Sequence, residues 1–229
     1  MIDFKIQKLI WDSTFFGYEI GKIEIPVDSD LEKVKNLIEK SQFKMIQIFS
    51  KKDLRYFLNL EHIDMKLTYS KKPSSNNRFT DIDIRSVSED LSGNLAKLAK
   101  QAGEFSRYNK DNKLKFKFEL MYEMWMRKSL KGELASEVFT HQNENIINGM
   151  VTVKNFLKDL EIGLIAVNDN VQSKGIGSQL IKFVENWAFS KNLENIFVTT
   201  QKENYAACQF YEKNKFIISD TNYIYHFWK

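Results

Sequence analysis

Hydrophobic residues recur with period two in some parts of this chain and with helical spacing in others, and the change between the two predicts its elements. In the first part, residues 19–25 alternate as a half-buried strand does, and residues 45–49 are typical of a second strand. Between them, residues 30–40 place apolar side chains on one face of a helix, at Leu31, Val34, Leu37 and Ile38. The pattern predicts a small α/β unit.

A polar stretch then interrupts the pattern. Residues 71–78 have the sequence KKPSSNNR, which combines turn-forming residues with one of only two prolines in the chain. With 229 residues, the chain also exceeds the commonest size of a single domain. We therefore predict a small α/β N-terminal domain at residues 1–70, a linker at 71–78 and a larger domain at 79–229.

The larger domain begins with a predicted strand and two predicted helices. Residues 81–87 alternate with period two, and Ser88 then supplies the start signal of a helix that continues through Leu98. Residues 103–112 have the character of a loop. A second helix is predicted at about residues 114–130, where an aromatic and methionine stripe is typical of plain core packing.

The pattern returns to strands after the second helix. Residues 138–141 and 146–153 flank the polar sequence QNEN and predict a hairpin. Residues 160–167 predict a third neighbouring strand, and residues 195–200 predict another one further along the chain. The order of strands and helices favours an α/β class of fold.

Composition narrows the class of protein. The chain is 43% hydrophobic and 28% charged, as soluble globular proteins are. No apolar run approaches the roughly 20 residues of a membrane-spanning helix, and the charged side chains among the first ten residues are unlike a secretory signal. We expect a soluble, cytoplasmic protein with no membrane partner. A net charge of +4, spread along the sequence, gives little support for nucleic-acid binding.

The candidate chemistry follows the strand at residues 160–167. That strand leads through QSKGIGS, residues 172–178, into a helix with one apolar face, formed by Leu180, Ile181, Val184, Trp187 and Ala188. Gly175 and Gly177 stand at the helix N-terminus, where unpaired N–H groups and the helix dipole favour a phosphate or pyrophosphate. The loop lacks the G-x-x-x-x-G-K-[ST] spacing of a nucleotide triphosphate site and the third glycine of a dinucleotide site.

This loop is similar to the Q/R-x-x-G-x-G/A loop with which GCN5-related N-acetyltransferases, the GNAT superfamily, bind the pyrophosphate of coenzyme A. Residues 204–216, NYAACQFYEKNKF, resemble the superfamily's N-x-x-A-x-x-x-Y-x-x-x-G-F element, with Asn214 and Lys215 where a glycine is common. The resemblance covers roughly residues 79–229. It implies an acyl-CoA-dependent N-acyltransferase whose mixed, mostly antiparallel sheet has helices on both faces and follows a smaller α/β N-terminal domain.

Carried over residue by residue, the resemblance implies a site for acetyl-CoA or another short acyl-CoA. The glycine loop would bind the pyrophosphate, and the preceding strand would bind the pantetheine arm as if it were an added strand. The backbone N–H of Ile165 would polarise the thioester carbonyl, and Gly163 would permit a bulge where the strands separate. The residues assigned to the cofactor are Leu164, Ile165, Val167, Gln172, Ser173, Lys174, Gly175, Ile176, Gly177, Ser178, Asn204 and Tyr211.

Asn204 and Tyr211 are about two helical turns apart, so they share a helix face. Asn204 is predicted to cap its helix and, by the resemblance, to contact the pantetheine. The phenol of Tyr211 can act as general acid to the leaving thiolate, while core packing beside Phe210 is the plainer interpretation. Cys208 has no partner at a spacing suited to covalent catalysis, so we expect direct attack by the amine. The three histidines lack partners at ligand spacing, and we predict no metal.

The N-terminal sequence WDSTFFG, residues 11–17, is similar to the opening of the TDP-fucosamine acetyltransferase group of this superfamily. FSRY, residues 105–108, resembles the substrate loop of those enzymes, which acylate an amino group of a deoxysugar linked to thymidine diphosphate. By this resemblance Phe105, Arg107 and Tyr108 bind a dTDP-aminosugar: Arg107 can bind a diphosphate, and the aromatic rings can stack on a pyrimidine or sugar. A solvated arginine between two packing aromatics is the plainer interpretation.

Several questions stay open at the level of sequence. The acceptor could instead be a protein N-terminus, a polyamine or an aminoglycoside, and a non-catalytic acyl-CoA-binding module is a further alternative. The acyl group depends on the pocket volume near the sulfur. Glu104 and the strand at residues 223–226 are candidates for the general base, and nothing in their spacing selects one. The resemblance also suggests a homodimer.

Overall fold

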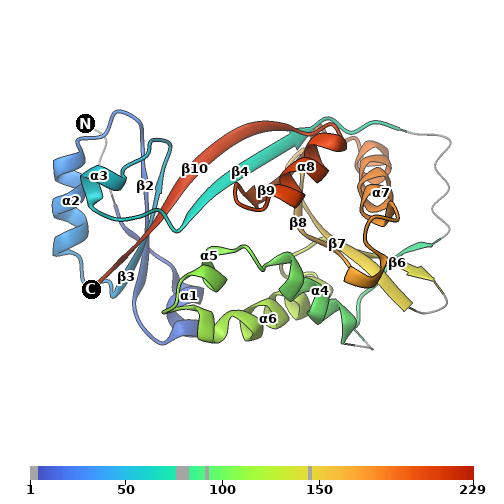
Figure 1. Ribbon diagram of the computed structural model, residues 1–229, viewed down its shortest axis with the longest axis horizontal. Helices are drawn as coiled ribbons and strands as arrows, with labels where there is room; N and C mark the ends of the chain where they lie inside the picture. Colours follow the sequence, from blue (N-terminus) through green and yellow to red (C-terminus); the bar gives the residue numbers. More distant parts are fainter. Residues whose placement is uncertain (1–4, 76–82, 91–92, 144–145) are drawn as a thin grey trace.

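The computed structural model describes residues 5–75, 83–90, 93–143 and 146–229, and its described strands form a single sheet (Figure 1). The order across the sheet is β1-β2-β3-β10-β4-β9-β8-β7-β6-β5. The strands are β1 (Gln7–Lys8), β2 (Ile20–Ile25), β3 (Met45–Ser50), β4 (Asp64–Lys71), β5 (Ile84–Ser86), β6 (Glu137–Asn143), β7 (Ile146–Phe156), β8 (Asp159–Val167), β9 (Asn195–Gln201) and β10 (Ile217–Trp228). β2 and β3 run parallel, as do β8 and β9, and the other neighbours are antiparallel.

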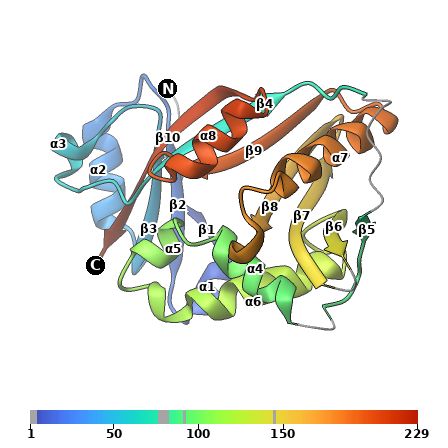
Figure 2. The same cartoon turned by 45° about the vertical axis from the view of Figure 1, so that its right-hand side comes forward.

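Helices cover both faces of the sheet, as predicted (Figures 1 and 2). They are α1 (Ile10–Phe16), α2 (Leu31–Lys40), α3 (Arg55–Leu58), α4 (Asn94–Ala102), α5 (Arg107–Lys110), α6 (Phe118–Leu130), α7 (Ile176–Ser190) and α8 (Tyr205–Lys213), with short 3₁₀ turns η1 (Lys115–Lys117) and η2 (Asp169–Val171). α2, α7 and α8 pack on one face, while α1, α4, α5 and α6 pack on the other. The mixed, mostly antiparallel α/β fold predicted from the sequence is confirmed.

The N-terminal unit contains the predicted strand, helix and strand as β2, α2 and β3. Asp30 caps α2, because its side chain accepts a hydrogen bond from the backbone N–H of Lys33 at 3.2 Å. Val34 and Ile38 of α2 are buried against Ile46 and Ile48 of β3. The pattern did not predict α1, which lies inside the WDSTFFG motif and ends at Gly17 with φ +85°, nor did it predict β4.

Strands from before and after residues 71–78 interleave. β10 lies between β3 and β4, and β4 lies between β10 and β9. Figures 1 and 2 show the long strands β4 and β10 running side by side from the N-terminal unit to β9. The division into two domains at residues 71–78 therefore stays a prediction. Residues 76–78 of the proposed linker and 81–82 of the predicted strand lie outside the described residues, as do 91–92 of the predicted helix and 144–145 of the hairpin turn.

Three predicted segments in the larger part start or divide differently. The helix expected to follow Ser88 begins at Asn94, although Asp90 does accept a hydrogen bond from the N–H of Ala96 at 3.0 Å. The expected loop at residues 103–112 contains the one-turn helix α5. The next helix starts with η1 and becomes α6 at Phe118.

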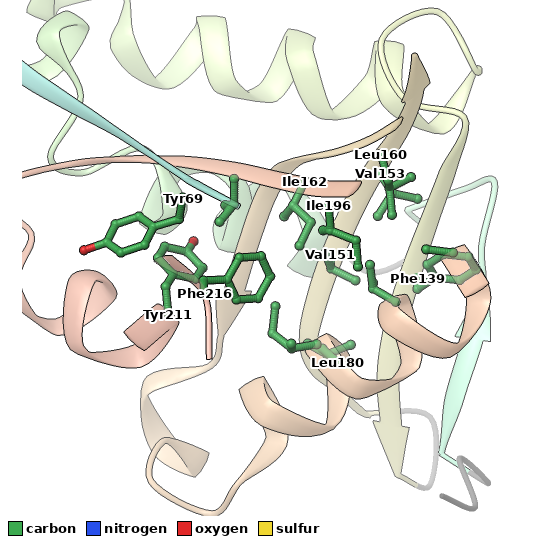
Figure 3. Packing of buried hydrophobic residues seen from close by; sticks show 14 of the residues in the cluster. Tyr69, Phe139, Val151, Val153, Leu160, Ile162, Leu180, Ile196, Tyr211 and Phe216 are labelled. Atoms are coloured by element: carbon green, nitrogen blue, oxygen red, sulfur yellow. The ribbon is translucent and has the colours of Figure 1, made fainter. Parts of the chain in front are cut away.

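The core beneath α7 and α8 holds the candidate site in place (Figure 3). Leu180 and Val184 of α7 are fully buried on the sheet, and Tyr211 of α8 packs among the same group of residues. Each such apolar side chain contributes roughly 1.5–3 kcal/mol through its removal from water. This burial anchors the two helices whose N-terminal ends line the site.

Candidate active site

One cleft brings the predicted cofactor and substrate segments together. It has a volume of about 1020 Å³ and is lined by β8, the loop before α7, the end of β9, α8, the α4–α5 connection and α6. From the predicted sets, its lining includes Leu164, Ile165, Val167, Gln172, Ser173, Gly175, Ile176, Gly177, Ser178, Asn204 and Tyr211, together with Phe105, Arg107 and Tyr108. Lys174 is not among its lining residues and its side chain is exposed.

The cleft enters the sheet where β8 and β9 separate. Their parallel ladder runs from the pair Asp159 and Asn195 to the pair Ile162 and Val198, although β8 continues to Val167. On the other side of β8, Ile162 pairs with Val153 and Leu164 pairs with Thr152, so Gly163 is an extra residue in the ladder. The bulge predicted at Gly163 is therefore present at the point where the strands diverge.

The bulge also sets which backbone groups face the gap. The N–H of Leu164 donates to the Thr152 hydroxyl at 2.9 Å, and the N–H of Asn168 donates to the Asn148 carbonyl at 2.8 Å, so both point toward β7. Because successive N–H groups of a strand point in opposite directions, those of Ile165 and Val167 point to the side from which β9 has departed. The backbone donor predicted at Ile165 is thus directed into the cleft.

The glycine loop ends at the N-terminus of α7. Gly175 has φ +86°, a conformation that L side chains rarely adopt. The N–H of Gln179 makes a bond of 3.0 Å to the Gly175 carbonyl, so the N–H groups of residues 176–178 precede the helical ladder. A Cβ on Gly177 would lie 3.0 Å from the Phe210 ring, so this glycine permits the close approach of α7 and α8.

Two glutamine side chains already occupy the end of the β8 edge. The Nε2 groups of Gln101 and Gln172 donate to the Val167 carbonyl at 3.0 and 3.3 Å. Both also donate to Asp169 Oδ1, at 2.7 and 2.8 Å. These bonds hold the loop against α4. Sequence patterns gave no sign of Gln101, because its contact with β8 spans 66 residues of the chain.

α8 places Asn204 and Tyr211 on the cleft. The Asn204 side chain accepts a hydrogen bond from the N–H of Ala207 at 3.1 Å, which confirms the predicted helix cap. Tyr211 is 4% exposed and packs against Tyr69 and Phe216, with ring centroids 5.5 and 5.9 Å away. Burial raises the pKa of Tyr211 well above its usual value, so the phenol keeps its proton at neutral pH.

The predicted substrate loop forms another part of the cleft lining. Arg107 lies over the Tyr108 ring, 4.5 Å from its centroid, and its Nη2 donates to the Tyr108 hydroxyl at 3.0 Å. That hydroxyl donates to Asp12 Oδ1 at 3.1 Å, which ties the loop to α1 and the WDSTFFG motif. Tyr108 is 5% exposed inside an aromatic cluster, whereas Phe105 is 37% exposed. Phe105 is therefore the more available ring for stacking.

Asp64 and Lys66 of β4 also line the cleft, and sequence reasoning missed both. Burial lowers the pKa of Lys66, with Arg107 as a second cause, so the two cations lie within electrostatic reach of each other. Neither Lys66 nor Arg107 takes part in any ion pair among the described residues. The alternation in DMKLTY, residues 64–69, was the signal that could have revealed a strand with Asp64 and Lys66 on one face.

The histidines lie outside this lining. His226 Nδ1 is 2.6 Å from Asp111 Oδ2, and Trp228 donates to the same oxygen at 2.9 Å. Burial lowers the pKa of His226, so this buried contact is structural. Within the described residues, no three His, Cys, Asp or Glu side chains gather as a metal site would require, and no helix there is long and apolar enough to cross a membrane.

Comparison with known protein families gives a match to the part of the chain that forms most of the cleft. The model of the acetyltransferase (GNAT) family matches residues 104–216, which include the glycine loop, α7 and α8. A comparison with curated protein sequences gave no match. The matched segment contains both motifs that carried the resemblance in the sequence.

Solved structures of this family share the fold. A GNAT acetyltransferase from Colwellia psychrerythraea is 11% identical, covers 99% of this chain and 100% of its own, and has a TM-score of 0.58. A GCN5-related N-acetyltransferase from Kribbella flavida is 9% identical over 90% of this chain and 80% of its own, with a TM-score of 0.58. The PaiA N-acetyltransferase of Thermoplasma acidophilum, solved with coenzyme A, is 14% identical over 65% of this chain and 100% of its own, with a TM-score of 0.51.

Residues 104–216 therefore form an acetyltransferase domain of the GNAT family. This segment is an acyl-CoA-dependent N-acetyltransferase domain, with acyl-CoA as its co-substrate. The resemblance found in the sequence is confirmed at the level of the superfamily. Membership of the TDP-fucosamine acetyltransferase group stays a prediction.

Proposed function

We propose that this enzyme transfers an acetyl or short hydroxyacyl group from coenzyme A to the amino group of a dTDP-linked amino-deoxysugar. The observation that carries the proposal is the pair of cations, Lys66 and Arg107, which line the same cleft as the glycine loop. Two neighbouring cations without an ion pair favour an anionic ligand, and a diphosphate is such a ligand. A polyamine or an aminoglycoside carries several positive charges and no anionic group that could pair with these two cations.

The rest of the cleft suits a long, two-part ligand. Phe105 is exposed beside Arg107, where its ring can stack on a pyrimidine or on the apolar face of a sugar. The similarity of residues 11–17 and 105–108 to the TDP-fucosamine acetyltransferase group supports the same acceptor. These two segments meet through the hydrogen bond between Tyr108 and Asp12, so the features of that resemblance belong to one structural unit.

In the proposed reaction, the acyl-CoA lies with its pyrophosphate at the N–H groups of residues 176–178 and its pantetheine along the edge of β8. The neutral amine attacks the thioester carbonyl, whose developing negative charge accepts a hydrogen bond from the N–H of Ile165. The carbon–sulfur bond breaks, and the thiolate takes a hydrogen bond or proton from Tyr211. No covalent acyl-enzyme forms.

A thiol-release assay tests donor and acceptor together. Acetyl-CoA and 3-hydroxybutyryl-CoA are each paired with dTDP-linked 3-amino and 4-amino dideoxysugars, and with a polyamine, an aminoglycoside and a peptide N-terminus. We expect turnover only with a nucleotide sugar, and competitive inhibition by thymidine diphosphate. Turnover of another amine that thymidine diphosphate leaves unaffected would contradict the proposal.

A matched pair of lysine variants tests the anion site. Lys66→Met should raise KM for the nucleotide sugar about 10- to 100-fold, because a charge-assisted hydrogen bond contributes about 1.5–3 kcal/mol. The Kd of acyl-CoA should not change. Lys72→Met, at an exposed residue outside the cleft lining, is the control and should leave KM unchanged. An unchanged KM in Lys66→Met would remove Lys66 from the acceptor site.

A further inference from the structure

N-acylation of an amine needs a group that removes a proton, and the cleft offers few candidates. An ammonium group loses two protons when it becomes an amide: one ends on the thiol of coenzyme A, and the other must leave through a base. Among the described residues that line the cleft there is no histidine. The carboxylates in that lining are Asp64, Glu104 and Asp169.

The surroundings of these carboxylates separate them. Asp169 accepts hydrogen bonds from Gln101 and Gln172 at 2.7 and 2.8 Å, beside the glycine loop. Glu104 has an exposed side chain, which bulk water solvates. Asp64 is 1% exposed, and neither of its carboxylate oxygens has a hydrogen-bond partner among the described residues. Buried polar atoms almost always have a partner, so two such oxygens call for a donor that the described residues do not supply.

Its place in the sheet puts Asp64 at the acceptor end of the cleft. Asp64 is the first residue of β4, and Lys66 shares its face because side chains alternate along a strand. Lys66 pairs with Gln201, the last residue of β9, so Asp64 lies beyond the end of β9. On the cleft side, the nearby substrate loop supplies Arg107. A donor that reaches Asp64 from the cleft comes from the acceptor rather than from coenzyme A.

The electrostatic balance at Asp64 suits proton transfer near neutral pH. Burial, the largest cause, raises the pKa of Asp64 to about 6. Arg107 and Lys110 of α5 and Lys66 of β4 lower it, while Glu203, which forms an ion pair with Lys110 at 2.7 Å, raises it. The carboxylate is therefore mostly ionised at pH 7, yet it is more basic than an exposed aspartate. Efficient general bases have a pKa close to the working pH.

We propose that Asp64 is the general base of the transfer, binding the ammonium group of the acceptor and taking one of its protons. This inference rests on the proposed acylation of an amine, but not on the identity of the sugar. Asp64 accepts a proton from the ammonium group, and the amine lone pair then attacks the thioester carbon. The carbon–sulfur bond breaks, the second proton goes to sulfur through Tyr211, and Asp64 returns its own proton to water.

The test is the pH dependence of kcat/KM for Asp64→Asn. In the natural enzyme we expect kcat/KM to fall below about pH 6, where Asp64 becomes protonated. Asp64→Asn should lower kcat/KM at pH 7 by about 10²–10³-fold and abolish that acidic limb. Its rate should recover toward that of the natural enzyme as the pH approaches the pKa of the amine, because the base is then no longer needed. Its Kd for acetyl-CoA should stay within about twofold, since the pyrophosphate loop is unchanged.

Glu61→Gln is the control, because it removes an exposed carboxylate outside the cleft lining, and it should keep the acidic limb and a kcat/KM within about threefold. Asp64→Glu keeps a carboxylate and should restore part of the rate and of the acidic limb. A merely structural role for Asp64 does not predict this recovery. The profile is measured with whichever amine the assay turns over, so loss of the nucleotide-sugar hypothesis leaves this test intact. An Asp64→Asn variant with an unaltered profile, or one whose loss appears equally at all pH values, would overturn the proposal.

Discussion

A buried carboxylate that lacks a hydrogen-bond partner lowers the stability of the fold, and Asp64, which has none within the described part of the chain, makes this measurable. Its pKa is raised from 3.8 to about 6, so the folded state binds more protons than the unfolded state between these pH values. Stability from this group is therefore lost as the pH rises through that window, by about 3 kcal/mol in total. The cost is complete at pH 7 and absent below about pH 4.

Asp64→Asn should consequently stabilise the protein while it reduces activity. We expect the free energy of unfolding at pH 7 to rise by about 1–3 kcal/mol, less than the full cost because the new amide is also buried. The gain should shrink as the pH falls from 6 to 4. Urea unfolding at several pH values measures it. A variant that is less stable than the natural protein at pH 7 would show that Asp64 has a stabilising partner.

Tyr211 and Tyr69 form a matched pair for a second test. Both are buried and their rings lie 5.5 Å apart, but Tyr211 lines the cleft, whereas Tyr69 donates to Glu212 at 3.0 Å. Figure 3 shows their hydroxyl groups pointing in different directions. Tyr211→Phe should lower kcat about 10²-fold with unchanged binding of acyl-CoA, because it removes only the proposed acid. Tyr69→Phe should keep kcat and lose about 1 kcal/mol of stability with its hydrogen bond.

Equal kcat values for these two tyrosine variants would remove the acid role of Tyr211. The pH profile adds an independent check. Because burial raises the pKa of Tyr211, its phenol stays protonated throughout an assay range of roughly pH 6–9. In the natural enzyme, kcat should therefore show no alkaline fall caused by Tyr211 over that range. If kcat does fall at high pH in the natural enzyme but not in Tyr211→Phe, the phenol is not buried as described.

At this scale, the sequence predicted residues whose roles are local and missed those whose roles depend on packing. Gly175 and Asn204 act through the helix that each one begins, so a motif of a few residues was enough to find them. Asp64 and Gln101 reach the cleft only because β4 lies beside β9 and α4 packs on β8. The alternation in DMKLTY marks a strand, but no local pattern shows which strand lies beside β4 or which strand α4 covers.

A substitution at Gly175, at the N-terminus of α7, tests how this helix binds the cofactor. Gly175→Ala places a side chain at φ +86°, which should cost about 1–2 kcal/mol of stability. It should also raise the Kd of acetyl-CoA about tenfold, because the N–H groups at the start of α7 lose their common direction. Gly132→Ala is the control: Gly132 has φ +77°, has open space around its missing Cβ and lies outside the cleft lining.

Isothermal titration of acetyl-CoA and thermal unfolding separate the two effects. Both glycine variants should lose similar stability, whereas only Gly175→Ala should lose affinity for the cofactor. A common loss of stability with equal Kd values would mean that the loop binds through side chains instead of its backbone. Both glycines have a positive φ, so each alanine variant should carry a similar backbone strain whether or not the cofactor is bound.

Predicted elements matched the structure where one face of an element is apolar over its whole length. α2, α6 and α7 follow this rule, and so do the strands around the bulge at Gly163. The start of α4 was misplaced because Ser88 and Asp90 supply cap-like side chains six and four residues before Asn94. β4 was missed although DMKLTY alternates with period two, and its polar face, with Asp64 and Lys66, lines the cleft.

For the whole molecule, the order of strands has a consequence for the predicted domain boundary. β4 supplies hydrogen-bonding partners to both β9 and β10, and β3 supplies the other partner of β10. A fragment of residues 79–229 would expose these strand edges and the apolar side chains beneath them. Exposed edges of this kind promote aggregation. The fragment would also lack Asp64 and Lys66, and with them part of the cleft lining.

We therefore expect residues 79–229 alone to be insoluble or to unfold without a cooperative transition, even though they include the whole segment that matches the family. Co-expression with residues 1–72 as a separate chain should restore a soluble complex that binds acetyl-CoA, because β4 can then pair with β9 and β10 in trans. Circular dichroism and titration of acetyl-CoA measure both outcomes. A soluble fragment 79–229 that melts cooperatively and binds acetyl-CoA with full affinity would instead establish the boundary at residues 71–78, with the N-terminal strands as a separable addition to the sheet.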